Sequence, residues 1–95
     1  MSAATDSISP GVQVRYWAAA RAAAGVESDF FNTAVPVSVA ELLERAAERR
    51  GPGLARVVGV CSILIGEEPL GTRAPDSVLV RPGDYIELLP PFAGG

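Results

Sequence analysis

Hydrophobic and polar residues alternate near the start of the chain, in the sequence VQVRYWA at residues 12–18. One face of this stretch carries four side chains: Val12, Val14, Tyr16 and Ala18. Alternation with a period of two, in β-branched and aromatic residues, predicts a β-strand. The alanine-rich stretch that follows ends in a glycine and predicts a short helix over residues 19–24. Residues 27–33 predict a second strand, which we expect to pair with the first through this connection.

A longer helix is predicted over residues 39–50. Ser38 is a good N-cap residue, and Glu41 lies three positions later, as in a capping box. The expected inward face follows helical spacing and is formed by Val39, Leu42, Leu43, Ala46, Ala47 and the stem of Arg50. Gly51 and then Pro52 are expected to end the helix.

The second half of the chain is read as strands. Apolar and β-branched residues predict a buried strand at 60–66, and shorter strands are expected at 68–70 and 78–80. A Pro-Gly-Asp turn at 82–84 precedes the last predicted strand, at 85–89. Strands that share one helix on one face indicate an α+β domain. The first and last strands are both strongly apolar, so we expect them to lie together at the centre of the sheet.

The sequence LLPPFAGG at residues 88–95 suggests a function for the end of the chain. Pro90 and Pro91 cannot donate to a strand ladder, and they favour an extended arm. Phe92 is a large apolar group on that arm, suited to a pocket on another protein. Gly94 and Gly95 have no Cβ and fit a channel too narrow for side chains. The α-carboxylate of Gly95 is ionised at neutral pH and is the candidate reactive group, through adenylation by ATP.

Composition narrows the possible chemistry. The chain has 95 residues, which suits one domain, and a net charge of −3, so we expect neither nucleic acid nor a membrane as a partner. It has no histidine, and all eight basic residues are arginine. A His/Cys zinc site, a P-loop and a Ser-His pair are therefore excluded, and no metal site is expected. We therefore expect this chain to contain no complete active site. With no secretory signal and a single cysteine, the expected location is the cytoplasm.

Four segments of the sequence resemble the ubiquitin-like sulfur carriers, and most of all the small subunit of molybdopterin synthase (the MoaD family). They are VRYWAAARAAAG, TAVPVSVAELLE, RPGDYIELLPP and the terminal PPFAGG. The resemblance implies a β-grasp fold, with a mixed four- to five-stranded sheet, one main helix on one face and an extended C-terminal tail. The implied division is a disordered extension at 1–11, a β-grasp domain at 12–89 and a Gly-Gly tail at 90–95.

The resemblance also implies a reaction and its partners. An adenylyltransferase similar to ubiquitin-activating enzymes, using ATP and Mg, is expected to adenylate the Gly95 carboxylate. A sulfurtransferase then supplies sulfur to give a thiocarboxylate. The large subunit of molybdopterin synthase would receive the tail, whose binding residues are Pro90, Pro91, Phe92, Ala93 and Gly94. There the thiocarboxylate would donate sulfur to the cyclic pyranopterin precursor. This chain itself is expected to bind no cofactor.

Two other functions use the same tail. The chain can be a protein modifier joined through Gly95 to lysines of other proteins, as ubiquitin is. It can also be a sulfur carrier for thiamine or cysteine synthesis. A passive interaction domain with the same fold is a third interpretation.

Overall fold

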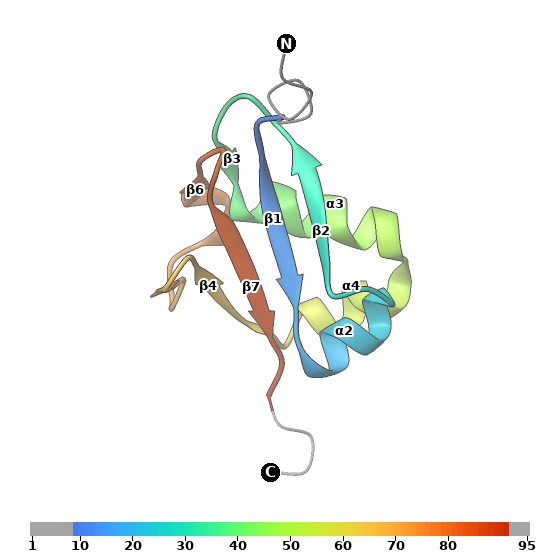
Figure 1. Cartoon of the computed structure of the whole chain (residues 1–95). Coiled ribbons are helices and arrows are strands. Elements are labelled where there is room, and N and C mark those ends of the chain that lie inside the picture. The colour runs from blue at the N-terminus through green and yellow to red at the C-terminus, as the bar shows by residue number, and fades with distance from the viewer. Residues whose placement is uncertain (1–8, 92–95) are drawn as a thin grey trace.

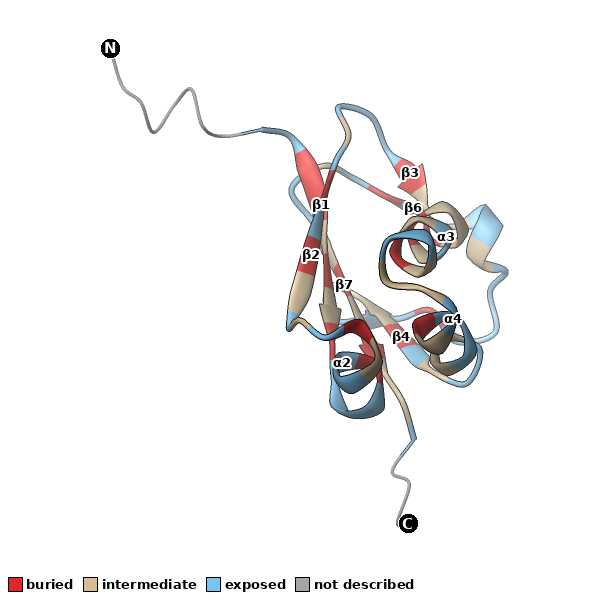
Figure 2. Ribbon diagram, turned by 90° about the vertical axis from the view of Figure 1, so that its right-hand side faces the viewer, coloured by how far each residue is buried: buried red, intermediate tan, exposed pale blue. Residues whose placement is uncertain are grey.

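The structure, a computed structural model, describes residues 9–91 and consists of a β-sheet with helices on one of its faces. Figure 2 shows the sheet edge-on, with α2, α3 and α4 on the same side of it. The elements of the described residues, in chain order, are β1 (Gly11–Tyr16), α2 (Ala18–Ala24), β2 (Ser28–Asn32), β3 (Val37–Ser38), α3 (Val39–Arg50), α4 (Pro52–Val58), β4 (Ser62–Ile65), β5 (Glu68–Pro69), the 3-10 turn η1 (Pro75–Ser77), β6 (Leu79–Val80) and β7 (Tyr85–Leu89).

The main sheet has five strands within residues 9–91, in the order β2-β1-β7-β4-β5, as Figure 1 shows for its first four strands. β1 and β7 run parallel at its centre, with Tyr16 opposite Leu88. β2 and β4 flank them in antiparallel register. The expected mixed sheet, with its first and last strands together at the centre, is therefore confirmed. β3 and β6 form a separate two-stranded sheet, in which β3 was not predicted.

Helix α3 spans the predicted residues, and its start confirms the expected N-cap. The Ser38 hydroxyl oxygen accepts a hydrogen bond from the Glu41 backbone N–H at 3.0 Å. This bond satisfies one of the N–H groups that a helix leaves without an internal partner. Val39, Leu42 and Ala46 are buried against the sheet, as the spacing predicted.

Helix α3 is the expected main helix, but a shorter helix in the segment after it was not predicted. Gly51 does end α3, with a φ of 100°, but Pro52 then occupies the first turn of a further helix, α4. Proline suits that position because its missing N–H has no partner there anyway. Leu54 of α4 is completely buried. The glycines around this segment indicated a loop, and burial of Leu54 outweighs their low helix propensity.

Two predicted strands have a boundary two residues away from the expected one. The first ends at Tyr16, because Ala18 takes a φ of 49° and starts α2 rather than extending the strand. The strand predicted at 60–66 covers only Ser62–Ile65. Val60 is exposed and Cys61 precedes the strand, since α4 ends only at Val58.

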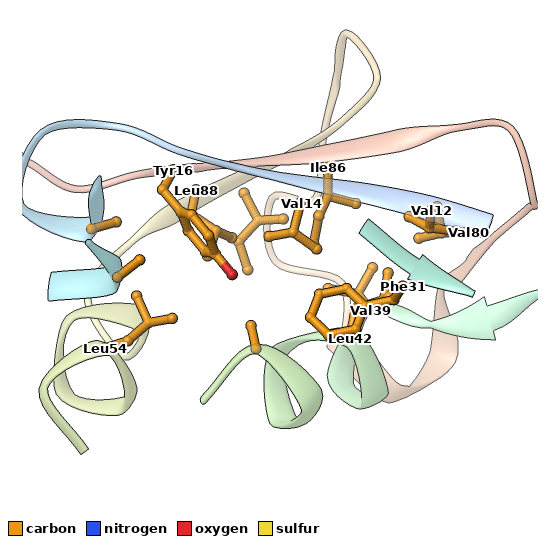
Figure 3. Close-up of a cluster of buried hydrophobic side chains, with 14 of the residues drawn as sticks. Val12, Val14, Tyr16, Phe31, Val39, Leu42, Leu54, Val80, Ile86 and Leu88 are labelled. Carbon is orange, nitrogen blue, oxygen red and sulfur yellow. The ribbon is translucent and has the colours of Figure 1, made fainter. Parts of the chain in front are cut away.

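The core fills the space between the sheet and the three helices. Figure 3 shows side chains from β1, β7 and the helices meeting there. Among the largest fully buried side chains are Val12, Val14, Tyr16, Val39, Leu42, Leu54, Val80, Ile86 and Leu88. Every inward position of β1 and β7 contributes to this core, which fixes the place of the strand that leads to the tail.

Candidate functional site

The end of β7 is the point where the tail leaves the sheet. Leu88 is fully buried, and its carbonyl oxygen accepts a hydrogen bond from the Trp17 backbone N–H at 3.2 Å. On the other side of β7, Leu89 pairs with Ser62 of β4. Pro90 and Pro91 follow and have no N–H to continue either ladder. The chain therefore passes out of a strand held on both sides, at the lower end of the sheet in Figure 1.

The tail residues that are expected to bind the partner and to react follow the last residue of the sheet, and only some of them are described. Pro90 is half-buried and Pro91 is exposed, directly after the last sheet residue. Phe92, Ala93, Gly94 and the reactive Gly95 lie outside the described residues, as do residues 1–8 of the expected N-terminal extension. The structure thus fixes the base of the tail, and the roles of its last four residues stay predictions.

Trp17 lies next to the end of β7 and is exposed over 41% of its surface. Its indole N–H donates to the Glu87 carboxylate at 2.8 Å. The Arg21 guanidinium lies over the indole, 5.2 Å from the ring centroid. Ala18, directly after Trp17, has a left-handed backbone that a non-glycine residue adopts only at some cost. Trp17 is thus tied to the tail-bearing strand by both its backbone and its side chain, and it belongs to the surface rather than the core.

The sheet face opposite the helices is the bare face, and it carries aromatic and charged side chains. Phe30 is exposed over 47% of its surface, and the Arg15 guanidinium lies 3.7 Å from the Tyr85 ring centroid. These three side chains line a hollow of about 470 Å³ near the start of β1. A Cβ on Gly11 would lie 2.5 Å from a Phe30 ring carbon, so glycine allows this ring to lie on the strand.

A buried carboxylate joins the sheet to α3 on the covered side. Asp29 of β2 is 6% exposed and accepts a hydrogen bond from the Tyr16 hydroxyl at 2.7 Å. It also accepts from Arg50 Nε at 2.9 Å and Arg49 Nη1 at 3.2 Å. Its Oδ1 is additionally paired with Arg50 Nη2. We call Asp29, Tyr16, Arg49 and Arg50 the Asp29 clamp, because it links β1, β2 and the end of α3.

The clamp sets the charge states of its members. Burial alone would raise the pKa of Asp29, but hydrogen bonds from Arg50, Tyr16 and Arg49 outweigh it and lower that pKa to about 2. Burial, with the hydrogen bond to Asp29, raises the pKa of Tyr16. Both groups thus keep their ordinary charge at neutral pH, so the clamp is structural. The sequence pattern did not indicate this clamp, and of its members only the stem of Arg50 was expected on the inward face of α3. The sequence pattern that could have indicated the clamp is an acidic residue, Asp29, at an inward position of β2 between two outward-facing neighbours.

The remaining candidate nucleophile is Cys61. Its thiol is half-buried and donates to the Val57 carbonyl oxygen at 3.3 Å. Burial raises the pKa of this thiol, which lowers the fraction of reactive thiolate at neutral pH. Within residues 9–91, no group of three or more His, Cys, Asp or Glu side chains is placed to hold a metal ion. In the same part of the chain, no helix has the length and apolar character needed to cross a membrane.

Comparison with known proteins gives sequence and structural relatives. No protein-family model matches the chain. It is 27% identical over 90 residues to the molybdopterin synthase sulfur carrier subunit of Aspergillus niger, covering 94% of this chain and 99% of that protein. It is also similar to a chain in the complex of subunits 1 and 2 of the molybdopterin-converting factor of Helicobacter pylori. That match has 28% identity and a TM-score of 0.59, and it covers 90% of this chain and 99% of that one.

The fold has relatives of another kind as well. SAMP1 of Haloferax volcanii, a small archaeal modifier protein, matches with a TM-score of 0.74 and 22% identity, over 90% of this chain and 99% of that one. At this identity the likeness concerns the fold. Together these relatives confirm the β-grasp fold and the resemblance to the molybdopterin synthase sulfur carriers.

Proposed function

We propose that this chain is the sulfur-carrying small subunit of a molybdopterin synthase. The carboxylate of Gly95 attacks the α-phosphate of ATP on an activating enzyme and releases pyrophosphate. The terminal sulfur of a persulfide donor then displaces AMP to give an acyl disulfide. A second thiol on the donor or activating enzyme cleaves the S–S bond, which releases the thiocarboxylate and leaves a disulfide on that protein. In the large subunit, this sulfur is transferred to the cyclic pyranopterin precursor of the molybdenum cofactor. A proposed partner of this kind agrees with the relative from Helicobacter pylori, which was solved as a complex of two subunits.

One observation carries the proposal: a firmly paired central strand leads directly into the Pro-Pro-Phe-Ala-Gly-Gly sequence. β7 is paired on both sides up to Leu88 and Leu89, so the first residue of the tail starts from a fixed position. The match to the sulfur carrier subunit of Aspergillus niger covers 94% of this chain, which supports the same use of the tail.

The proposed sulfur transfer agrees with the side chains that the described residues contain. A thiocarboxylate is anionic at neutral pH and needs no neighbouring base to act as a nucleophile. The described residues contribute a scaffold, and the one thiol among them is half-buried with a raised pKa. The acid, the base and the nucleotide site are therefore expected from the partners.

Intact mass measurement tests the proposal. After co-expression with its activating enzyme, the chain is expected to gain the mass difference of one oxygen replaced by one sulfur. Deleting Gly95 is expected to abolish this gain, while thermal unfolding stays unchanged because the sheet ends at Leu89. A variant with all 95 residues and a C-terminal amide serves as the matched control for chain length. Sulfur incorporation into the amide, or the lack of dithiolene formation by native chain with the large subunit, contradicts the proposal.

A second candidate function is a modifier joined through Gly95 to lysines of other proteins. The likeness to the small archaeal modifier protein favours it, through the fold alone. The chain has no lysine of its own, since all eight basic residues are arginine. Any lysine found linked to Gly95 therefore belongs to another protein, and peptide mass spectrometry of cell extracts identifies it without ambiguity. Such conjugates without any dithiolene-forming activity favour this function over the first.

A further inference from the structure

Two arginines, Arg15 of β1 and Arg21 of α2, form no ion pair with an acidic side chain among the described residues. The ion pairs of residues 9–91 involve four other arginines: Arg45, Arg49, Arg50 and Arg73. Arg15 on the bare face and Arg21 on α2 take part in none of them. Surface arginines without an ion pair are common, but Arg15 and Arg21 also share the way in which their guanidinium groups are held.

Both guanidinium groups are held in place by an aromatic ring and a single hydrogen bond. Arg15 lies over Tyr85, and its Nε donates to the Gln13 side-chain oxygen at 2.9 Å. Arg21 lies over Trp17, and its Nε donates to the Tyr16 carbonyl oxygen at 3.3 Å. In both cases Nε makes the contact, and the two terminal nitrogens have no hydrogen-bond partner within residues 9–91. A guanidinium held in this way loses little further entropy on binding a carboxylate with its terminal nitrogens.

The two arginines line one hollow of about 300 Å³, together with Trp17, Glu27 and Ser28. We call it the arginine hollow. Glu27 brings one negative charge to its rim, although no ion pair joins Glu27 to either arginine in the described chain. The hollow adjoins the tail, because Trp17 binds the Leu88 carbonyl through its backbone. Figure 1 shows α2, which carries Arg21, beside the lower end of β7.

We propose that the arginine hollow binds an acidic side chain, Asp or Glu, on the protein that receives the tail. The proposal rests on the proposed function and adds the chemistry of the partner surface. A protein that encloses the tail from Pro90 onward must also cover the surface around the end of β7. There it meets two fixed, unpaired guanidinium groups next to an exposed indole. A carboxylate matches both in charge and in geometry, since a guanidinium binds a carboxylate through two parallel hydrogen bonds. Trp17 supplies the apolar contact that arginine-rich protein interfaces commonly contain.

Binding of the large molybdopterin synthase subunit from the same organism, measured by calorimetric titration, tests the inference. The test variant is Arg15→Gln/Arg21→Gln. The matched control is Arg56→Gln, an exposed arginine on α4 that is likewise outside every ion pair of the described residues. We expect the double variant to bind about tenfold more weakly or worse, and the control to bind within about twofold of the native chain. Glu27→Gln is expected to tighten binding, because it removes the negative charge at the rim. Raising the salt concentration should weaken binding of the native chain to the large subunit more than binding of the double variant.

Other results of these binding measurements would overturn the inference or the proposed function. Equal binding by the double variant and the native chain, with folding confirmed by circular dichroism, overturns the inference and leaves the proposed function standing. An equal loss in Arg56→Gln also overturns it, because the effect is then one of overall charge. Binding of inorganic phosphate by the native chain alone, lost in the double variant whose affinity for the large subunit is unchanged, assigns the hollow to a phosphate group and overturns the inference. If the native chain fails to bind the large subunit at all, the proposed function fails, and the inference fails with it.

Discussion

The two faces of the five-stranded sheet are built from the same strands but have opposite characters. The covered face carries side chains that are wholly removed from water, such as Val14, Ile86 and Leu88. The bare face carries partly exposed aromatic rings and the unpaired Arg15. Since successive strand residues point to opposite faces, neighbours in sequence belong to different environments. Side chains on the covered side of each strand therefore stabilise the fold, and those on the bare side form the surface offered to partners.

The largest expected effect comes from two adjacent leucines of β7. Leu88→Ala removes a fully buried side chain and is expected to lower the free energy of unfolding by about 2–5 kcal/mol. Leu89→Ala, at a half-buried position on the bare face, is expected to cost less than about 1.5 kcal/mol. Urea denaturation of the two variants measures the difference. Equal losses would show that the bare face is buried in solution, for example against a second copy of the chain.

The Asp29 clamp is the polar counterpart of the core on the covered side. Asp29→Asn removes the charge that binds two arginines and is expected to cost about 2–3 kcal/mol of unfolding free energy. This loss of unfolding free energy is small for a buried ion pair that loses one partner, because Arg49 and Arg50 can turn toward water. Asp76→Asn, an exposed acid in η1, is the matched control and is expected to change stability by less than about 0.5 kcal/mol. A clamp that contributes nothing would leave the two variants alike in urea denaturation.

The same clamp predicts how stability depends on pH. The pKa of Asp29 falls from 3.8 to about 2 on folding, so the folded state favours the ionised carboxylate. The resulting stabilisation, about 2 kcal/mol, is complete above about pH 5 and is lost as the pH falls through 4 toward 2. Urea midpoints measured between pH 6 and pH 2 should therefore fall more steeply for the native chain than for Asp29→Asn. Parallel curves would mean that Asp29 has an ordinary pKa in the folded protein.

The smallest effects are expected at the two aromatic neighbours at the end of β1. Tyr16→Phe removes the hydroxyl that donates to Asp29 and is expected to cost about 1–2 kcal/mol. Trp17→Phe removes an exposed hydrogen bond to Glu87 and is expected to cost about 0.5 kcal/mol. Thermal unfolding of both variants gives the comparison. A larger loss for Trp17→Phe would reverse the assignment of these residues to core and surface.

Sequence patterns predicted most of the fold because local signals and burial agree there. Alternation identified β1, and helical spacing with Ser38 as N-cap gave α3 its observed bounds. Helix α4 escaped prediction because Gly51, Pro52 and Gly53 indicate a loop when only local propensity is considered. The burial of Leu54, which stabilises this helix, is a tertiary contact that no local pattern records.

The candidate site was predictable in part. The Pro-Pro segment marks the end of the last strand, and the structure places that end at Leu89 as expected. The Asp29 clamp was not predictable, because Asp29 and its two arginines are 20 and 21 residues apart and meet only when β2 packs beside α3. The arginine hollow lies within residues 13–28, but its shape depends on how β1, α2 and the start of β2 are placed relative to one another. Trp17 and Glu87 are 70 residues apart, yet they share a hydrogen bond.

The sequence by itself determined the strands at the centre of the sheet, the main helix and the nature of the chemistry available to this chain. Side-chain periodicity follows from the backbone geometry of strands and helices, and the lack of histidine and lysine follows from composition alone. Only the tertiary structure decided which charges are satisfied and which remain open. Asp29 is neutralised by arginines brought to it from α3, whereas Arg15 and Arg21 lie over aromatic rings and form no ion pair within residues 9–91. The physical reason is that pairing of charges depends on distances of a few ångströms across elements, which are fixed only when the sheet and helices pack together.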